Sequence, residues 1–296
     1  MSFEFSMASS LARALATVAL FGLLGCSPSL PNREVIVFEK WLPNGDGLSW
    51  GNRVELWAVD ADGSNLRRLT SGNHDGDVAW SPDRKRVAFS RAEKGGVRLL
   101  RLEDASQVEL AQGLRCLYPK WISSDTILCS TPSGEHEDLR RRWRLHTYSE
   151  KAPSGAPVET GGLEGVFAPA VSRDFRHLAF SAYREGKRSV FIADLPLPLK
   201  TPRAILNEGG FPQAWMPDGR RLLVSYERTC SILGLDGMAE PLSFEVEQCN
   251  LSWSPDGRRV AFQFNQAIWI ADSDGKNRQL VVQPSDMSHF MKPSWS

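Results

Sequence analysis

The chain of 296 residues has no excess of either charge, because 35 Lys and Arg residues balance 35 Asp and Glu residues. Proteins that bind the phosphate backbone of nucleic acids usually carry a basic surface. We therefore expect no nucleic-acid partner. With 42% hydrophobic residues and ten tryptophans, the composition is that of a globular protein with a sizeable core.

The sequence also lacks an apolar run long enough to cross a bilayer, which takes about 20 residues. The run Leu15–Gly25, which follows Arg13, has only eleven residues and is typical of the core of a secretory signal peptide. It ends in Leu23-Leu24-Gly25-Cys26, which resembles the bacterial lipobox, where the cysteine is lipidated and becomes the mature N-terminus. An ordinary secretory signal with a chance cysteine is the alternative.

We expect residues 1–26 to form a lipoprotein signal peptide, with lipidation at Cys26, and residues 27–33 to form a polar tether. Ser27 follows the cysteine where an Asp would signal retention at the inner membrane in this class of lipoprotein. The expected location is therefore the periplasmic side of the bacterial outer membrane, with the membrane contacted through the lipid alone.

One pattern recurs along the rest of the chain. Trp253-Ser254-Pro255-Asp256-Gly257 combines a strand end with a type I-like turn, in which proline already has the required φ. Val260–Phe262 then resumes a β-prone run. Related turns follow Trp80, Val171 and Trp215.

The anchor residues that precede these turns recur every 38 to 50 residues, at Trp80, Trp121, Val171, Trp215, Trp253 and Trp295. This period, with several short strands in each unit, is the signature of a β-propeller blade. The first unit lacks a first strand, whereas Lys292–Ser296 matches the start of a unit. We therefore predict an all-β fold over residues 34–296: a six-bladed β-propeller closed by pairing of the C-terminal strand into the first blade. A Trp-rich β-sandwich with accidental turns is the alternative.

The repeat resembles that of the periplasmic TolB family, which also occurs in the propellers of prolyl-oligopeptidase-like enzymes. The residues that carry the resemblance are Trp80–Asp83, Trp215–Gly219, Trp253–Gly257 and Pro293–Ser296. It covers essentially residues 34–296 and is specific for fold rather than function. The TolB family engages envelope partners through its propeller, so the resemblance implies a binding protein.

The favoured hypothesis is a non-enzymatic, lipid-anchored binding or scaffold protein that docks an envelope protein or peptide. We expect a monomer without a cofactor. The alternative is a carbohydrate-active enzyme of the envelope, a polysaccharide lyase or hydrolase, which would need a metal or carboxylate–histidine constellation at the channel.

Binding residues concentrate on loops that a rigid scaffold holds. The loops between second and third strands, and between blades, open on one face of a propeller. We expect the long ones at Trp41–Arg53, Gly72–Asp77, Ser130–Arg144 and Ala182–Arg188.

Three groups on these loops are candidates. Trp41 and Trp50 form an exposed aromatic pair or else pack between blades. His74 and Asp75 lie in a stretch that could ligate Ca²⁺ but lacks the twelve-residue loop, so we predict an ordinary turn and no metal. The third group could grip carboxylates or phosphates, or form a solvated loop neutralised by its acidic half; it contains His136, Arg140, Arg141, Arg142 and Arg144.

Without Cys26, four cysteines are left in a chain expected to be exported, which allows two disulfides. All four fall at the same long-loop face. We predict the pairs Cys116–Cys129 and Cys230–Cys249, with four buried or free thiols as the alternative.

Overall fold

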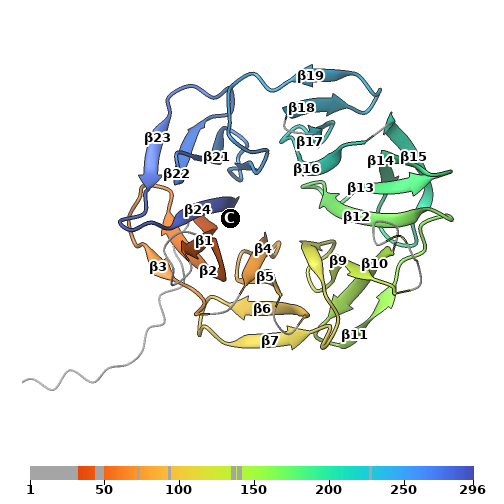
Figure 1. The fold of residues 1–296 in the computed structure, drawn as a ribbon, viewed down its shortest axis with the longest axis horizontal. Coiled ribbons are helices and arrows are strands. Elements are labelled where there is room, and N and C mark those ends of the chain that lie inside the picture. Colours follow the sequence, from red (N-terminus) through yellow and green to blue (C-terminus); the bar gives the residue numbers. More distant parts are fainter. Residues whose placement is uncertain are drawn as a thin grey trace, which may run out of the picture. The chain divides into compact units, whose positions relative to one another are not determined.

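The computed structural model describes residues 33–43, 50–71, 74–92, 95–134, 138, 142–207, 209–226 and 229–296, without the side chains of residues 50–52. These residues form six four-stranded sheets, set as blades in a ring around a central channel (Figure 1). The fold is therefore the predicted six-bladed β-propeller. The predicted signal peptide, with Cys26, and most of the predicted tether lie outside the described residues.

The strands of each blade run from the channel outwards, with the innermost strand named first. Blade 1 consists of β24 (His289–Trp295), β1 (Val35–Pro43), β2 (Trp50–Asp60) and β3 (Arg67–Arg68). Blade 2 consists of β4 (Asp75–Trp80), β5 (Arg86–Arg91), β6 (Val97–Arg101) and β7 (Gln107–Leu110). Blade 3 consists of β8 (Leu117–Trp121), β9 (Ile127–Pro132), β10 (Trp143–Ser149) and β11 (Ala152–Pro157).

The other three blades follow in chain order. Blade 4 consists of β12 (Glu164–Val171), β13 (His177–Arg184), β14 (Lys187–Asp194) and β15 (Lys200–Asn207). Blade 5 consists of β16 (Phe211–Trp215), β17 (Arg221–Tyr226), β18 (Thr229–Gly234) and β19 (Ala239–Pro241). Blade 6 consists of β20 (Ser252–Trp253), β21 (Arg259–Phe264), β22 (Ala267–Asp272) and β23 (Gln279–Val282).

The C-terminal strand closes the ring as predicted. β24 pairs antiparallel with β1, so that Trp295 lies opposite Ile36 and His289 opposite Trp41. The Ser296 backbone N–H donates to the Val35 carbonyl, and the Val35 N–H donates to the Ser296 hydroxyl. Closure of this kind supplies blade 1 with its innermost strand, so that all six blades have four strands and only short edges, which limits edge-to-edge aggregation.

The ring has two faces, which differ in their connections. The turn face carries the turns between the first and second strands of the blades and between the third and fourth. The loop face carries the loops between second and third strands and the connections between blades. All four predicted loops are too long. The strands β1 and β2 reach residues 43 and 50, and β13 and β14 are joined through Glu185 and Gly186. The other two are shortened because β4 begins at Asp75, β9 extends to Pro132 and β10 begins at Trp143.

The repeated turn is stabilised by one serine and one aspartate. The Ser254 hydroxyl donates to Asp256 at 2.6 Å and accepts the Arg259 backbone N–H, while Asp256 accepts the Arg258 N–H. Gly257 completes the turn with φ of 73°, a conformation that glycine adopts without strain. The equivalent hydroxyl bonds recur in blades 2 and 4, which explains why the pattern is so regular in the sequence.

The anchor tryptophans join neighbouring blades. The indole Nε1 of Trp121 donates to the Ala79 carbonyl of blade 2, and that of Trp215 donates to the Ala170 carbonyl of blade 4. Trp80 does the same with Ser294 of blade 1. Buried aliphatic and aromatic side chains fill the space between adjacent blades, so the core is divided among the blade interfaces.

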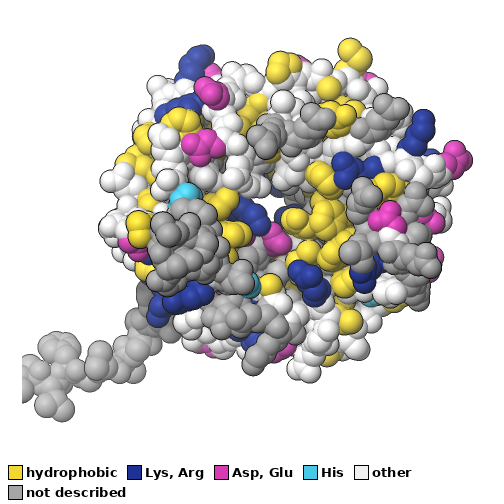
Figure 2. All heavy atoms as spheres, in the orientation of Figure 1, with side chains coloured by type: hydrophobic (Ala, Val, Ile, Leu, Met, Phe, Trp, Pro, Cys, Tyr) yellow, Lys and Arg dark blue, Asp and Glu magenta, His cyan; other side chains and the backbone are white. Residues whose placement is uncertain are grey.

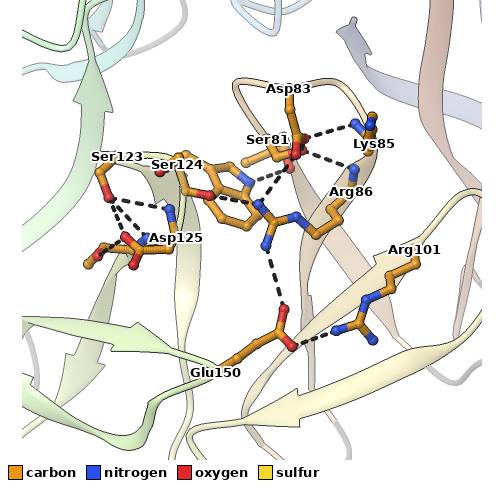
Figure 3. A network of polar contacts seen from close by, with 12 residues as sticks. Ser81, Asp83, Lys85, Arg86, Arg101, Ser123, Ser124, Asp125 and Glu150 are labelled. Atoms are coloured by element: carbon orange, nitrogen blue, oxygen red, sulfur yellow. Dashed lines mark hydrogen bonds and ion pairs between the residues drawn. The ribbon is translucent and has the colours of Figure 1, made fainter.

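A polar network reinforces the contact between blades 2 and 3 (Figure 3). Arg86 lies over the Trp121 ring, donates to the Ser124 carbonyl at 2.6 Å and pairs with Glu150 at 3.5 Å. Glu150 also pairs with Arg101. Because these residues connect blades 2 and 3, we infer that the network stabilises the fold. In the described part of the chain no helix is long and apolar enough to cross a membrane.

Candidate binding site in the central channel

The central channel contains a cavity of about 730 Å³ that residues from the innermost strands of all six blades line. Its two ends open on different faces of the ring. The loop-face end is bordered by the beginnings of the innermost strands, and the turn-face end by the anchor residues and the turns that follow them. The loop-face end combines charged and aromatic side chains and is the candidate site.

A repeated backbone irregularity shapes this end of the channel. In blades 1 to 4 the pairing of the innermost strand shifts register a few residues before the anchor. The residue three positions before each anchor has a positive φ, between 46° and 55°, at Asp77, Tyr118, Ala168 and Lys292. Such bulges redirect side chains, and all four residues line the cavity.

One wall of the site is charged. The Lys292 ammonium group lies 2.9 Å from Asp77 Oδ1 and 3.3 Å from Glu39 Oε1. Glu39 is 1% exposed and also accepts the Asp77 backbone N–H and the Trp41 indole N–H. Burial alone would lower the pKa of Lys292, but the two carboxylates outweigh it and raise that pKa well above its usual range. The three side chains therefore form one contiguous polar network.

Lys120 adds a cation without a hydrogen-bonded or ion-paired partner among the described residues. The other five blades place Ala or Ser at this position, one residue before the anchor. Burial lowers the pKa of Lys120, and the negative charge of Asp77 opposes that shift in part. Lys120 lines the cavity. The repeat therefore does not require a lysine at this position.

The opposite wall is aromatic. The ring centroid of Phe167 lies 5.0 Å from that of Tyr118, 5.3 Å from Trp143 and 6.0 Å from Phe211, in tilted or edge-to-face arrangements. The Arg188 guanidinium carbon lies 4.3 Å from the centroid of Phe211. Four rings from three blades thus form one partly exposed surface, which we call the aromatic wall.

Figure 2 shows the two walls around the opening: hydrophobic side chains gather beside β12 and β16, and charged side chains lie beside β24 and β4. Aromatic rings offer large apolar area at low conformational cost, and paired charges give orientation. The site therefore suits a ligand with apolar or aromatic groups next to polar or charged ones, such as a peptide segment.

Comparisons with known proteins agree with the fold. The TolB structure from Acinetobacter baumannii superposes with a TM-score of 0.67 at 17% identity, over 88% of this chain and 66% of that one. The putative TolB from Agrobacterium tumefaciens gives a TM-score of 0.56 at 15% identity, over 88% and 91% of the two chains. The fold is that of the TolB propellers. This chain spans just under two thirds of the A. baumannii protein.

Enzymes share the same fold. A puromycin hydrolase structure gives a TM-score of 0.55 at 14% identity, over 86% of this chain and 48% of that one. No family model and no curated protein matches the sequence. At these identities the structural likeness shows the fold alone.

The predicted loop residues fall into different environments. Trp41 is half-buried and belongs to the charged wall through its bond to Glu39 at 2.9 Å. Asp75 is fully buried and forms two hydrogen bonds with Arg91, at 2.6 and 2.7 Å, so it neutralises an arginine. His74 lies in the connection before β4 with φ of 60°. The described residues contain no group of three or more side chains placed to hold a metal ion.

The predicted arginine cluster is only partly described. The Arg142 carbonyl accepts hydrogen bonds from the backbone and hydroxyl of Ser133, which closes the loop before β10. Arg144 donates to the Trp143 carbonyl. The others, together with the side chain of Trp50, lie outside the described residues: His136, Arg140 and Arg141.

Both predicted cysteine pairs are disulfides in the structure. Cys116 and Cys129 have Cα atoms 5.6 Å apart, and Cys230 and Cys249 have Cα atoms 5.5 Å apart. Each bond joins the residues before an innermost strand to a neighbouring strand. Cys249 itself lines the cavity. The disulfides therefore hold segments that border the site.

Most of the site lies on the innermost strands, whereas the sequence-based prediction looked for it on the loops between strands. Asp77, Tyr118 and Lys292 occupy one position of the repeat, three residues before the anchor, and Phe167 and Phe211 occupy the position before it. Aligning the six units on their anchors would have shown charged and aromatic side chains at two adjacent positions. That alignment is the signal that could have found the site.

One further sequence match bears on catalysis. Gly47-Leu48-Ser49-Trp50-Gly51 fits the Gly-x-Ser-x-Gly pattern of α/β-hydrolase nucleophiles. That pattern is functional on a sharp turn from a strand to a helix. In this chain it falls between the antiparallel strands β1 and β2, and residues 44–49 lie outside the described residues. Among the described residues, Trp50 and Gly51 of this match belong to β2, a strand of an antiparallel hairpin.

Proposed function

We propose that this protein is a non-enzymatic, lipid-anchored binding or scaffold protein of the bacterial cell envelope, which docks a protein or peptide at the loop-face end of its channel. The observation that carries the proposal is the aromatic wall facing a charged wall across one cavity. The resemblance to the TolB family, which engages envelope partners through its propeller, supports it.

The partner's docking segment must complement both walls. Aromatic side chains in partly enclosed pockets are the usual centres of binding energy at protein interfaces. Phe167 and Phe211 offer such a centre, and the Lys120 ammonium group, which has no bonded partner among the described residues, can bind a carboxylate or a carbonyl oxygen. A peptide that brings an apolar side chain next to an oxygen acceptor satisfies both requirements.

The direction in which the chain enters the propeller supports the use of the loop face. The entry lies at the turn face, where Arg33 pairs with Asp60 and Glu34 pairs with Arg259. With lipid on Cys26, the intervening residues 27–32 reach at most about 20 Å even when fully extended. The described chain therefore begins on the face opposite the candidate site.

The anchor is tested by the Cys26→Ser variant. We expect that wild-type protein labels with palmitate and sediments with outer membranes, whereas the variant does neither. Unchanged membrane fractionation of the variant, together with failure of the wild type to label, would refute the lipid anchor while leaving the binding site open to its own test.

Docking is tested by crosslinking in intact envelopes, followed by quantitative capture of the wild type, Phe211→Ala and Arg258→Ala. Arg258 is 86% exposed on the turn face and serves as the matched surface control. We expect one or more discrete adducts that Phe211→Ala reduces at least fivefold and Arg258→Ala leaves unchanged. Adducts of equal yield in all three proteins would contradict docking at the aromatic wall.

A further inference from the structure

The turn-face end of the channel carries two arginines that the fold does not require. Arg84 of blade 2 and Arg173 of blade 4 both line the cavity. The Arg173 guanidinium donates to the Ser254 carbonyl of blade 6 at 3.4 Å, so this side chain reaches across the channel opening. The two cations therefore border one end of the channel, away from the aromatic wall.

Both residues replace the ordinary residue of the repeat. Arg173 stands where the other Ser-Pro-Asp-type turns have proline, at Pro82, Pro217 and Pro255. Arg84 stands where two of them have glycine, at Gly219 and Gly257. Its φ of 57° is one that glycine adopts freely and an L-residue adopts at a cost. Turn formation therefore explains neither arginine.

The nearby carboxylates do not neutralise this pair by direct contact. Asp83, Asp174 and Asp256 each accept the serine hydroxyl and a backbone N–H of their own turn. Among the described residues, neither Arg84 nor Arg173 has an ion-pair partner within 4 Å. Burial lowers the pKa of Arg173, the positive charge of Arg84 lowers it further, and Asp256 opposes the shift. The positive charges of Arg84 and Arg173 therefore face the same end of the channel.

We propose that Arg84 and Arg173 form a binding site for a phosphate-type oxyanion at the turn-face end of the channel. Guanidinium groups present paired N–H donors that match the oxygens of a phosphate, and an anion between them removes their mutual repulsion. A free phosphate and the phosphodiester of a lipid headgroup share this chemistry. The proposal is independent of partner docking, because it uses other residues on the opposite face.

The repeat itself supplies variants that should fold. Arg173→Pro and Arg84→Gly install the residues that other blades carry, and no hydrogen bond from the Arg173 backbone N–H is present among the described contacts. The probes are inorganic phosphate and glycerophosphoethanolamine, a soluble phosphodiester headgroup, titrated by calorimetry at low ionic strength. Arg220→Ala and Arg258→Ala, exposed turn-face arginines outside the cavity lining, are the controls.

We expect saturable binding of at least one probe to the wild type, weakened about tenfold or more by each cavity variant and abolished in the double variant. Both control variants should bind as the wild type does. Tighter binding of the phosphodiester assigns the site to lipid headgroups, and tighter binding of inorganic phosphate assigns it to a free phosphate. No saturable binding, or equal losses in the control variants, would overturn the proposal.

Discussion

The two faces of the ring use the same strands in opposite ways. On the turn face, blades 2, 4 and 6 repeat the same serine–aspartate turn, and the anchors bind neighbouring blades through backbone carbonyls. On the loop face, the residues three and four positions before the anchors differ from blade to blade and form a charged wall and an aromatic wall. The regular face explains the fold, and the irregular one explains the candidate site.

The contrast separates the residues that the repeated fold requires from those that it does not require. A repeated residue has a repeated partner, as Ser254 has in Asp256. A residue that departs from the repeat has either a partner specific to its place, as Lys292 has in Glu39 and Asp77, or no bonded partner among the described residues, as with Lys120. Departures are therefore the positions to test for function, and repeated positions are those to test for stability.

The largest stability effect is expected at the charged wall, because its network is buried. Glu39→Ala removes the acceptor for Trp41 and for the Asp77 N–H and leaves the Lys292 charge with one partner. We expect a loss of about 3 kcal/mol in the free energy of unfolding, measured with urea. Glu39→Gln, which keeps the hydrogen-bonding shape, should lose less. Equal unfolding free energies of Glu39→Ala and wild type would show that the charged wall does not contribute to the stability of the fold.

A smaller difference in unfolding free energy is expected between substitutions of two anchor tryptophans that occupy the same place in different blades. The Trp215 indole N–H donates to the Ala170 carbonyl, whereas the Trp253 indole N–H is buried without an acceptor among the described residues. Trp215→Phe should therefore cost about 1 kcal/mol more than Trp253→Phe in urea unfolding. The reverse order would mean that packing, rather than the hydrogen bond, determines how anchors join blades.

Removing the repeated serine should cost about the same in each blade that has it. Ser254→Ala leaves the Arg259 backbone N–H without its hydroxyl acceptor, so we expect a loss of about 1 kcal/mol. Ser81→Ala should behave alike, and the double variant should lose the sum because the two turns are in different blades. Chemical denaturation checks the sum, and strong non-additivity would contradict independent turns.

The smallest expected effect per residue is the loss of unfolding free energy at acidic pH. Hydrogen bonds from Ser172 and Ser254 lower the pKa of Asp174 and Asp256, and the serine and backbone donors of the turn lower that of Asp83 against the opposing effect of burial. A carboxyl group whose folded pKa is lowered stabilises the protein above its unfolded pKa of about 4, and that contribution disappears as the pH falls through the folded pKa.

We therefore expect unfolding free energy to fall between about pH 4 and pH 2, with a shallower slope in the Ser81→Ala/Ser254→Ala double variant. Asp286, whose pKa the Ser288 hydroxyl and Lys40 lower to about 2, contributes in the same window on the loop face. Urea unfolding at stepped pH measures the slope. An identical slope in the double variant would show that the turn aspartates are not responsible.

The fold could be predicted from the sequence because its determinants are local and repeated. Trp253–Gly257 encodes a turn that any chain with those residues favours, and the period then fixes the blade count. The repeated turns do not reveal the site, since Asp77, Tyr118 and Lys292 come together through ring closure and bulges, and only an alignment of the units on their anchors shows these residue types at one position. The overestimated loops have a related cause, because strand pairing carried β1 and β2 through residues that look irregular in isolation.

Docking at the loop-face end of the channel is tested most directly by comparing the two faces in living cells. A photoreactive phenylalanine analogue is placed at Phe211 in the aromatic wall and, in a second protein, at Arg258 on the turn face. We expect a discrete protein adduct from position 211 that the additional change Phe167→Ala suppresses, and no such adduct from position 258. Adducts from position 258 alone, or none from position 211, would contradict a docking site at the loop-face end of the channel.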